Sequence, residues 1–178
     1  RARMPEPDDW SLFDDTDADD SPWGDTSLPP RAAPPEPAPP RSFQAAAGIQ
    51  GRQFAEQCDT LLEHLGFTLG GRRVLTEVGV EVDQVAVSPG GITVWFEYKG
   101  SVQGVRPGLR RTDTLKKAVA NGALLRALAD PAPYVVVTSH LPEAGSGAAM
   151  LMQALRLGYF SDVVCLYDPA AVARLKRW

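Results

Sequence analysis

The sequence predicts an α/β domain in which helices cover both faces of a mixed sheet. Three observations lead to this class. Apolar residues near the start of the domain recur with helical spacing, those between residues 74 and 99 alternate with a period of two, and the later strand-like segments are separated by helical ones. The expected order is α-β-β-β-α-β-α-β-α over about 135 residues, enough for one packed domain.

The first expected helix spans residues 44–65 and ends at Gly66. Five apolar residues fall at i, i+4, i+7, i+8 and i+11 and form one stripe along it: Phe54, Cys58, Leu61, Leu62 and Leu65. A helix with a single apolar stripe buries that stripe against another layer, which here is the predicted sheet.

Two or three strands follow this helix. Every second residue from Val74 to Val82 is a valine or threonine, and every second residue from Ile92 to Tyr98 is apolar. The segment Ser88-Pro89-Gly90-Gly91 separates the two runs as a turn. We therefore expect adjacent strands that place alternate side chains on opposite faces of the sheet.

The second half of the domain alternates helices with strands. After a loop at 100–111, the expected elements are a helix from Thr112 or Asp113 to about Leu128, a strand at 134–139, a helix at 146–157, a strand at 163–167 and a helix at 170–177. Strands that are joined through helices imply right-handed crossovers and parallel pairing.

Residues 1–43 differ from the rest and predict a disordered arm in front of the domain at 44–178. They hold ten acidic residues, four arginines and ten of the sixteen prolines, so their charge is about −6 and that of the domain about +2. Apolar side chains among the acids are typical of a segment that docks on a partner protein: Trp10, Leu12, Phe13 and Trp23. The alternatives are a solvating tail and a pseudo-DNA strand that covers the domain's own basic surface.

Composition excludes several classes of protein. No apolar run approaches the roughly 20 residues that cross a bilayer, and we find no signal-peptide core at the start. Two cysteines, Cys58 and Cys165, make neither a disulfide scaffold nor a four-ligand zinc site. We expect a cytoplasmic protein without membrane contact.

Three charged residues on the predicted strands carry the chemical hypothesis. Glu97 and Lys99 are separated by one residue and should project from the same face of a strand, and Asp83 lies on the preceding strand. Charges on otherwise apolar strands need a reason, because buried unpaired charge is costly. A divalent cation between the two carboxylates would supply one, since Mg²⁺ and Mn²⁺ prefer oxygen ligands. The alternative is an ion pair on an exposed sheet face.

Asp83, followed fourteen residues later by Glu97-Tyr98-Lys99 on the strand WFEYK, resembles the PD-(D/E)XK nuclease superfamily, the restriction-endonuclease-like fold. The resemblance covers about residues 45–140 and includes a preceding helix that ends in Leu-Gly-Phe and a basic helix afterwards. It implies metal-dependent hydrolysis of phosphodiester bonds, with Asp83 and Glu97 as Mg²⁺ or Mn²⁺ ligands and Lys99 as the catalytic lysine. Val82 stands where the superfamily's name has proline, a position that varies widely.

A third acidic ligand is less clearly marked. Many members of that superfamily carry a glutamate on the first helix, where this chain has Ala55; Glu56 stands one residue further, about 100° round the helix. Glu56 is retained as a candidate metal ligand, with a solvated helix charge as the alternative. Glu81 is another candidate, because it would share a face with Asp83 in a regular strand.

Basic residues follow the three charged ones where a nucleic-acid backbone would run: Arg106, Arg110 and Arg111 in the loop, and Lys116 and Lys117 in the next helix. Such side chains contact phosphates and give affinity without reading sequence. The alternative is a solvated helix face beside a mobile loop.

Together these features predict a Mg²⁺-dependent DNA endonuclease that uses metal-activated water, in restriction, repair or phage–host conflict. Cleavage of both strands would favour a homodimer. The alternative is a non-catalytic nucleic-acid-binding or accessory subunit with the same fold, recruited through the acidic arm. RNA is a further candidate substrate.

Overall fold

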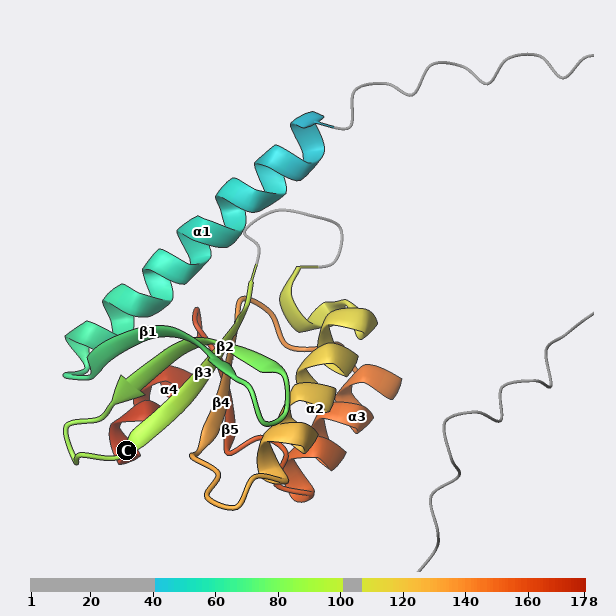
Figure 1. Cartoon of the computed structure of the whole chain (residues 1–178). Coiled ribbons are helices and arrows are strands. Elements are labelled where there is room, and N and C mark those ends of the chain that lie inside the picture. Colours follow the sequence, from blue (N-terminus) through green and yellow to red (C-terminus); the bar gives the residue numbers. More distant parts are fainter. Residues whose placement is uncertain (1–40, 101–106) are drawn as a thin grey trace, which may run out of the picture. The chain divides into compact units, whose positions relative to one another are not determined.

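A computed structural model of the chain describes residues 41–100 and 107–178 (Figure 1). Its five-stranded sheet contains β1 (Thr68–Leu75), β2 (Val80–Val87), β3 (Thr93–Lys99), β4 (Tyr134–Thr138) and β5 (Asp162–Cys165) in that order, so each strand lies beside its neighbour in sequence. The pairs β1–β2 and β2–β3 are antiparallel, and the pairs β3–β4 and β4–β5 are parallel. The predicted mixed sheet is therefore confirmed.

The order of elements is the predicted one. The elements are α1 (Arg41–His64), β1 (Thr68–Leu75), β2 (Val80–Val87), β3 (Thr93–Lys99), the 3-10 helix η2 (Gly108–Arg110), α2 (Thr112–Arg126), β4 (Tyr134–Thr138), α3 (Ser146–Arg156), β5 (Asp162–Cys165), α4 (Pro169–Ala173) and the 3-10 helix η3 (Arg174–Arg177). Helix α1 begins three residues before the predicted boundary at 44. Nearly all of the predicted arm, with Trp10, Leu12, Phe13 and Trp23, lies outside the described residues.

The alternation from Val74 to Val82 does not form one strand, which corrects the sequence prediction. Strand β1 ends at Leu75 and β2 begins at Val80. Between them Val78 N–H donates to the Leu75 carbonyl at 3.2 Å, and Gly79 adopts a positive φ of 64°. The valine pattern therefore continues through a turn, where alternation does not report which face a residue occupies.

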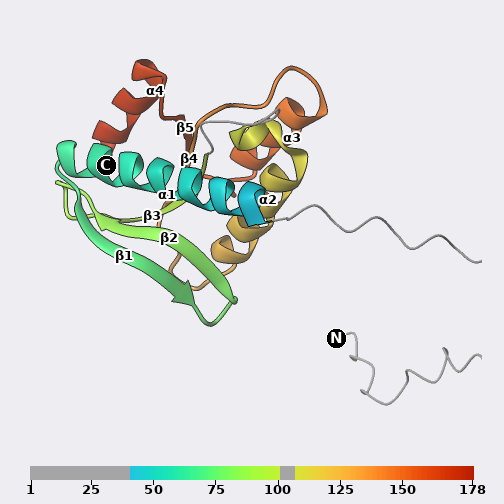
Figure 2. The same cartoon turned by 90° about the horizontal axis from the view of Figure 1, so that it is seen from above.

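Helices cover both faces of the sheet, as predicted, and each face has its own apolar core (Figures 1 and 2). On one face α2 and α3 pack against the strands through Leu115, Leu125, Leu151, Trp95 and Val136. On the other face α1 and α4 pack through Phe54, Cys58, Leu62, Phe96 and Val135. The apolar stripe predicted on the first helix faces this second core.

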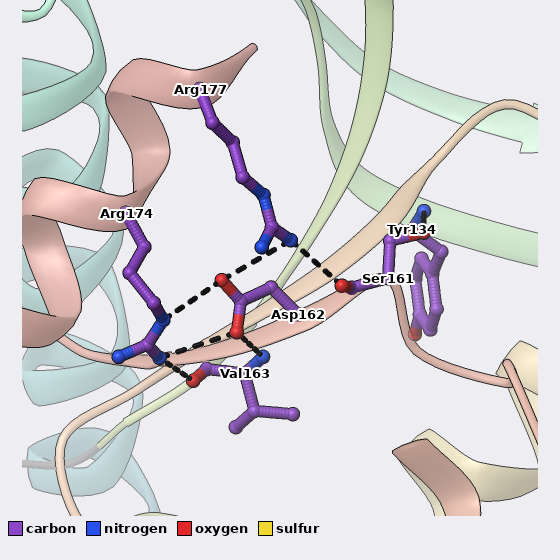
Figure 3. A network of polar contacts seen from close by, with 6 residues as sticks. All are labelled: Tyr134, Ser161, Asp162, Val163, Arg174 and Arg177. Atoms are coloured by element: carbon purple, nitrogen blue, oxygen red, sulfur yellow. Dashed lines mark hydrogen bonds and ion pairs between the residues drawn. The ribbon is translucent and has the colours of Figure 1, made fainter. Parts of the chain in front are cut away.

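A charged network fastens the closing helical segment to the sheet (Figure 3). Asp162, 8% exposed at the start of β5, accepts Arg174 Nε at 3.1 Å and lies 3.3 Å from Arg177 Nη2. Arg177 also donates to the Ser161 carbonyl at 2.8 Å. The two arginines come from η3, so the network anchors the last helical turn to the strand before it.

None of the helices in residues 41–100 and 107–178 combines the length and the apolar character needed to span a membrane.

Candidate functional site

Glu97 and Lys99 lie on the same face of β3, the face that α2 and α3 cover. Alternate residues of β3 point to opposite faces, and Trp95, two residues before Glu97, belongs to the core beneath α2. The ammonium of Lys99 forms an ion pair with Glu97 Oε1. Glu97 is 2% exposed and Lys99 is half-buried, so this pair is largely buried, unlike the exposed ion pair that was the alternative interpretation.

The second oxygen of Glu97 is buried and has no hydrogen-bond partner among the residues that the structure describes. Burial raises the pKa of Glu97, the charge and hydrogen bond of Lys99 lower it, and the nearby charge of Asp83 raises it again. The hydroxyl of Tyr134 lies close enough to lower it slightly, without a hydrogen bond of good geometry. Glu97 is therefore a desolvated carboxylate whose charge Lys99 offsets at only one oxygen.

Asp83 reaches the end of β3 through a β-bulge. Along β1 the step from Gly71 to Arg73 is two residues, whereas the opposing step on β2, from Val85 back to Val82, is three. The extra residue breaks the alternation at Asp83, as bulges near functional sites commonly do. The bulge therefore redirects the Asp83 side chain relative to a regular strand.

The carboxylate of Asp83 accepts a hydrogen bond from the backbone of β3. Pairing between β2 and β3 ends at Gln84 and Phe96. The N–H of Trp95 donates to the Pro133 carbonyl, on the β4 side, so by alternation the N–H of Tyr98 points toward β2. That N–H donates to Asp83 Oδ2 at 2.8 Å. Asp83 is thus bound to the residue between Glu97 and Lys99, where the pairing of β2 and β3 ends.

Asp83 and Glu97 supply carboxylate oxygens, the donors that a divalent cation such as Mg²⁺ prefers. A buried carboxylate oxygen without a partner is costly, and a cation would remove that cost. Within the described ranges, no three His, Cys, Asp or Glu residues are arranged to hold a metal. Two carboxylates are enough for Mg²⁺, which usually keeps several waters and binds substrate phosphate as well. Asp83 and Glu97 are the residues that would hold it.

The two candidate third acids, Glu56 and Glu81, do not lie with this pair in the structure. Glu56 is exposed on α1, because it lies on the polar side of the helix, away from the buried stripe of Phe54 and Cys58. Glu81 is exposed and pairs with Arg72 on the edge strand at 3.1 Å. It precedes the bulge, so the alternation that would have placed it beside Asp83 is broken.

The acid that α1 does direct at the sheet is Asp59, which sequence reasoning missed. Its Oδ1 accepts the hydroxyl of Tyr98 at 2.6 Å and the side-chain amide of Gln84 at 3.0 Å. A signal existed in the sequence: Tyr98 follows Val94 and Phe96 on one face of its strand, so a hydroxyl on that apolar face required a polar partner. Asp59 is adjacent to Cys58, at the edge of the apolar stripe.

Four of the predicted phosphate contacts lie on a segment that is hydrogen-bonded to the end of β3. The Thr138 hydroxyl donates to the Lys99 carbonyl at 2.7 Å, and Leu109 N–H donates to the His140 carbonyl at 3.0 Å and to Thr138 Oγ1 at 3.3 Å. These bonds fix η2 and the start of α2 at the Lys99 end of the sheet. Four predicted phosphate contacts are exposed on this segment: Arg110, Arg111, Lys116 and Lys117.

Two of the predicted basic contacts differ from Arg111, Lys116 and Lys117. Arg110 lies 3.5 Å from the exposed carboxylate of Glu143, which offsets part of its charge. Arg106, the fifth predicted contact, lies outside the described residues. The basic surface described by the structure therefore depends mainly on Arg111, Lys116 and Lys117.

Comparison of the chain with protein-family models, with curated proteins and with solved structures finds no match.

Proposed function

We propose that this chain is a metal-dependent nuclease with a restriction-endonuclease-like core that hydrolyses phosphodiester bonds in DNA. The observation that carries the proposal is the buried carboxylate of Glu97, with one oxygen paired to Lys99 and the other without a partner in the described part of the chain. Asp83 lies beside it on the neighbouring strand. A cation shared by Asp83 and Glu97 would account for this concentration of charge on two apolar strands.

Each charged residue has a distinct part in the proposed reaction. Asp83 and Glu97 would hold Mg²⁺ or Mn²⁺ through carboxylate oxygens. When bound, such a cation makes water more acidic and offsets negative charge on phosphate. Lys99, with a side chain 16% exposed beside Glu97, supplies a positive charge that can orient the attacking water or stabilise a phosphate oxygen.

The chemistry balances without a further reactant. The oxygen of water forms a bond to phosphorus, and the bond from phosphorus to one ester oxygen breaks. The leaving oxygen takes up a proton, so the products are a phosphate monoester and a hydroxyl. Lys99 and the exposed basic residues from Arg110 to Lys117 would hold the phosphate backbone while this occurs, without reading base sequence.

The test is a cleavage assay with supercoiled plasmid, linear duplex, single-stranded DNA and RNA, each in Mg²⁺, Mn²⁺ or EDTA. The proposal expects metal-dependent cutting of DNA that is lost in Glu97→Gln. The matched control is Glu81→Gln, which removes an exposed charge two residues from Asp83 and should keep activity. Cutting by Glu97→Gln at the wild-type rate would refute the assignment of Glu97 as a metal ligand. Preferential cutting of RNA would identify RNA, in place of DNA, as the substrate.

One observation favours a different function, that of a nucleic-acid-binding or accessory subunit without catalysis. The ion pair with Lys99 by itself partly neutralises Glu97, as a purely structural pair would. Calorimetric titration with Mn²⁺ separates the two functions. Binding of Mn²⁺ that is lost in Asp83→Asn supports the nuclease, whereas DNA binding without Mn²⁺ uptake supports the accessory subunit.

A further inference from the structure

One oxygen of Asp59 on α1 connects the two strands that carry Asp83 and Glu97. This oxygen, Oδ1, accepts the Tyr98 hydroxyl at 2.6 Å and the Gln84 amide at 3.0 Å. Gln84 directly follows Asp83 on β2, and Tyr98 directly follows Glu97 on β3. The side chain of Tyr98 packs against the core beneath α1, so the contact is made on the face of the sheet opposite to Glu97.

Tyr98 is held at both of its polar ends. Its N–H donates to Asp83 Oδ2 at 2.8 Å and its hydroxyl donates to Asp59. Burial, and after it the hydrogen bond to Asp59, raise the pKa of Tyr98, so the hydroxyl remains a donor. Tyr98 cannot move along the strand without breaking one of these two short bonds, and Glu97 and Lys99 on either side of it share the restraint.

We infer that Asp59 is a positioning residue, which fixes the separation of Asp83 and Glu97 from the far face of the sheet and so sets the affinity of the site for a divalent cation. This inference rests on the proposed function, which assigns Asp83 and Glu97 as ligands. The inference does not assign Asp59 as a ligand, because its Oδ1 accepts two hydrogen bonds from the strands on the face opposite to Glu97. Residues that orient metal ligands commonly change metal affinity by about 10- to 100-fold.

Two variants break the contact from its two sides. Asp59→Ala removes the acceptor, whereas Tyr98→Phe removes only the hydroxyl and keeps the packed ring. Calorimetric titration with Mn²⁺ should give binding about tenfold weaker in each variant. The double variant should lose no more than Asp59→Ala alone, because Asp59→Ala already removes the bond to the Tyr98 hydroxyl, together with the bond from Gln84.

Two further variants separate positioning from a general loss of stability. Asp59→Asn keeps a side-chain oxygen that can accept the Tyr98 hydroxyl, and it should recover most of the Mn²⁺ affinity. Tyr167→Phe is the matched control: it removes a hydroxyl that donates to Gln57 on the same helix at 3.1 Å, and it should leave Mn²⁺ affinity unchanged. Urea unfolding of every variant shows whether a change in affinity follows a change in stability.

A second measurement needs no metal. Hydrogen exchange of the Tyr98 amide, followed by NMR in EDTA, should be faster in Asp59→Ala and Tyr98→Phe than in Tyr167→Phe. Mn²⁺ affinity equal to that of the wild type in Asp59→Ala and Tyr98→Phe would overturn the inference, whatever their stability. If the wild-type protein itself binds no Mn²⁺, the proposed function fails, and the exchange rates alone then support or overturn the positioning role.

Discussion

Asp83 and Tyr98 are joined by a hydrogen bond of 2.8 Å in which a side-chain oxygen of β2 accepts a backbone N–H of β3. The bond forms just beyond the point where the backbone ladder of these strands ends, at Gln84 and Phe96. A carboxylate therefore takes the place of a backbone carbonyl. Because Glu97 is the residue before Tyr98, this backbone contact ties Asp83 to the segment that carries Glu97.

The first prediction separates the structural part of Asp83 from its proposed part in metal binding. Asp83→Asn keeps an oxygen that can accept the Tyr98 N–H, whereas Asp83→Ala leaves that donor without its partner. We expect the free energy of unfolding to stay near the wild-type value for Asp83→Asn and to fall by about 1–2 kcal/mol for Asp83→Ala. Both variants should lose Mn²⁺ binding. Urea unfolding and calorimetry measure these quantities. If Asp83→Ala is as stable as the wild type, the hydrogen bond to the Tyr98 N–H does not stabilise the fold.

The second prediction concerns the pH dependence of stability in the metal-free protein. Burial is the largest influence on Glu97 and raises its pKa above the ordinary value of about 4.3. As pH rises from the ordinary pKa of the unfolded chain toward the higher pKa of the folded protein, the Glu97 carboxyl loses its proton in the unfolded chain before it does so in the folded protein. Glu97 therefore lowers stability progressively over that interval, and its full cost is present above the folded-state pKa.

Glu97→Gln should remove this contribution. The free energy of unfolding of the variant minus that of the wild type should increase as pH rises from about 4.3, because only the wild type carries the titrating group. Urea unfolding in EDTA at a series of pH values gives this difference. The contributions of the other titratable groups, which both proteins share, cancel in it. A difference that is constant with pH would mean that Glu97 has its ordinary pKa in the folded protein.

The third prediction concerns Gly108, which lets η2 approach the end of β4. Gly108 has φ of 60°, and a Cβ at this position would lie 2.6 Å from Thr138 Oγ1. Gly79 has a similar φ of 64°, and a Cβ there would have no atom within 4 Å, so this position isolates the backbone cost. Gly79→Ala should cost about 1–2 kcal/mol of stability. Gly108→Ala should cost roughly 1–3 kcal/mol more, because it also overpacks the contact.

Thermal and urea unfolding of the two alanine variants check this comparison. Equal losses of stability in Gly108→Ala and Gly79→Ala would show that η2 can move away from Thr138 at no cost.

The fourth prediction concerns the exposed lysines at the start of α2. If Lys116 and Lys117 each contact a phosphate, replacing either by alanine should make the negative slope of log K against log salt concentration shallower by about 0.9 for duplex DNA. Fluorescence anisotropy at several KCl concentrations measures this slope. Lys176→Ala in η3 is the control, since this exposed lysine lies on the segment fastened to the start of β5. An unchanged slope in Lys116→Ala and Lys117→Ala would remove them from the interface.

Local patterns in the sequence were sufficient for the order of elements and for one part of the candidate site. The stripe of Phe54, Cys58 and Leu62 predicts a helix with one buried side, and α1 buries those residues. Glu97 and Lys99 share a face because strand geometry places residues two apart on the same side. Neither conclusion depends on where other segments lie.

The sequence by itself determined which segments are helices and strands, and that Glu97 and Lys99 would project together. Only the tertiary structure decided that β2 bulges at Asp83, that Asp59 rather than Glu56 faces the strands, and that Glu81 turns to Arg72. The physical reason is that a bulge and a helix-to-sheet contact arise from pairing between segments distant in sequence. The register across that pairing, which no local period encodes, sets the direction of each of these acids.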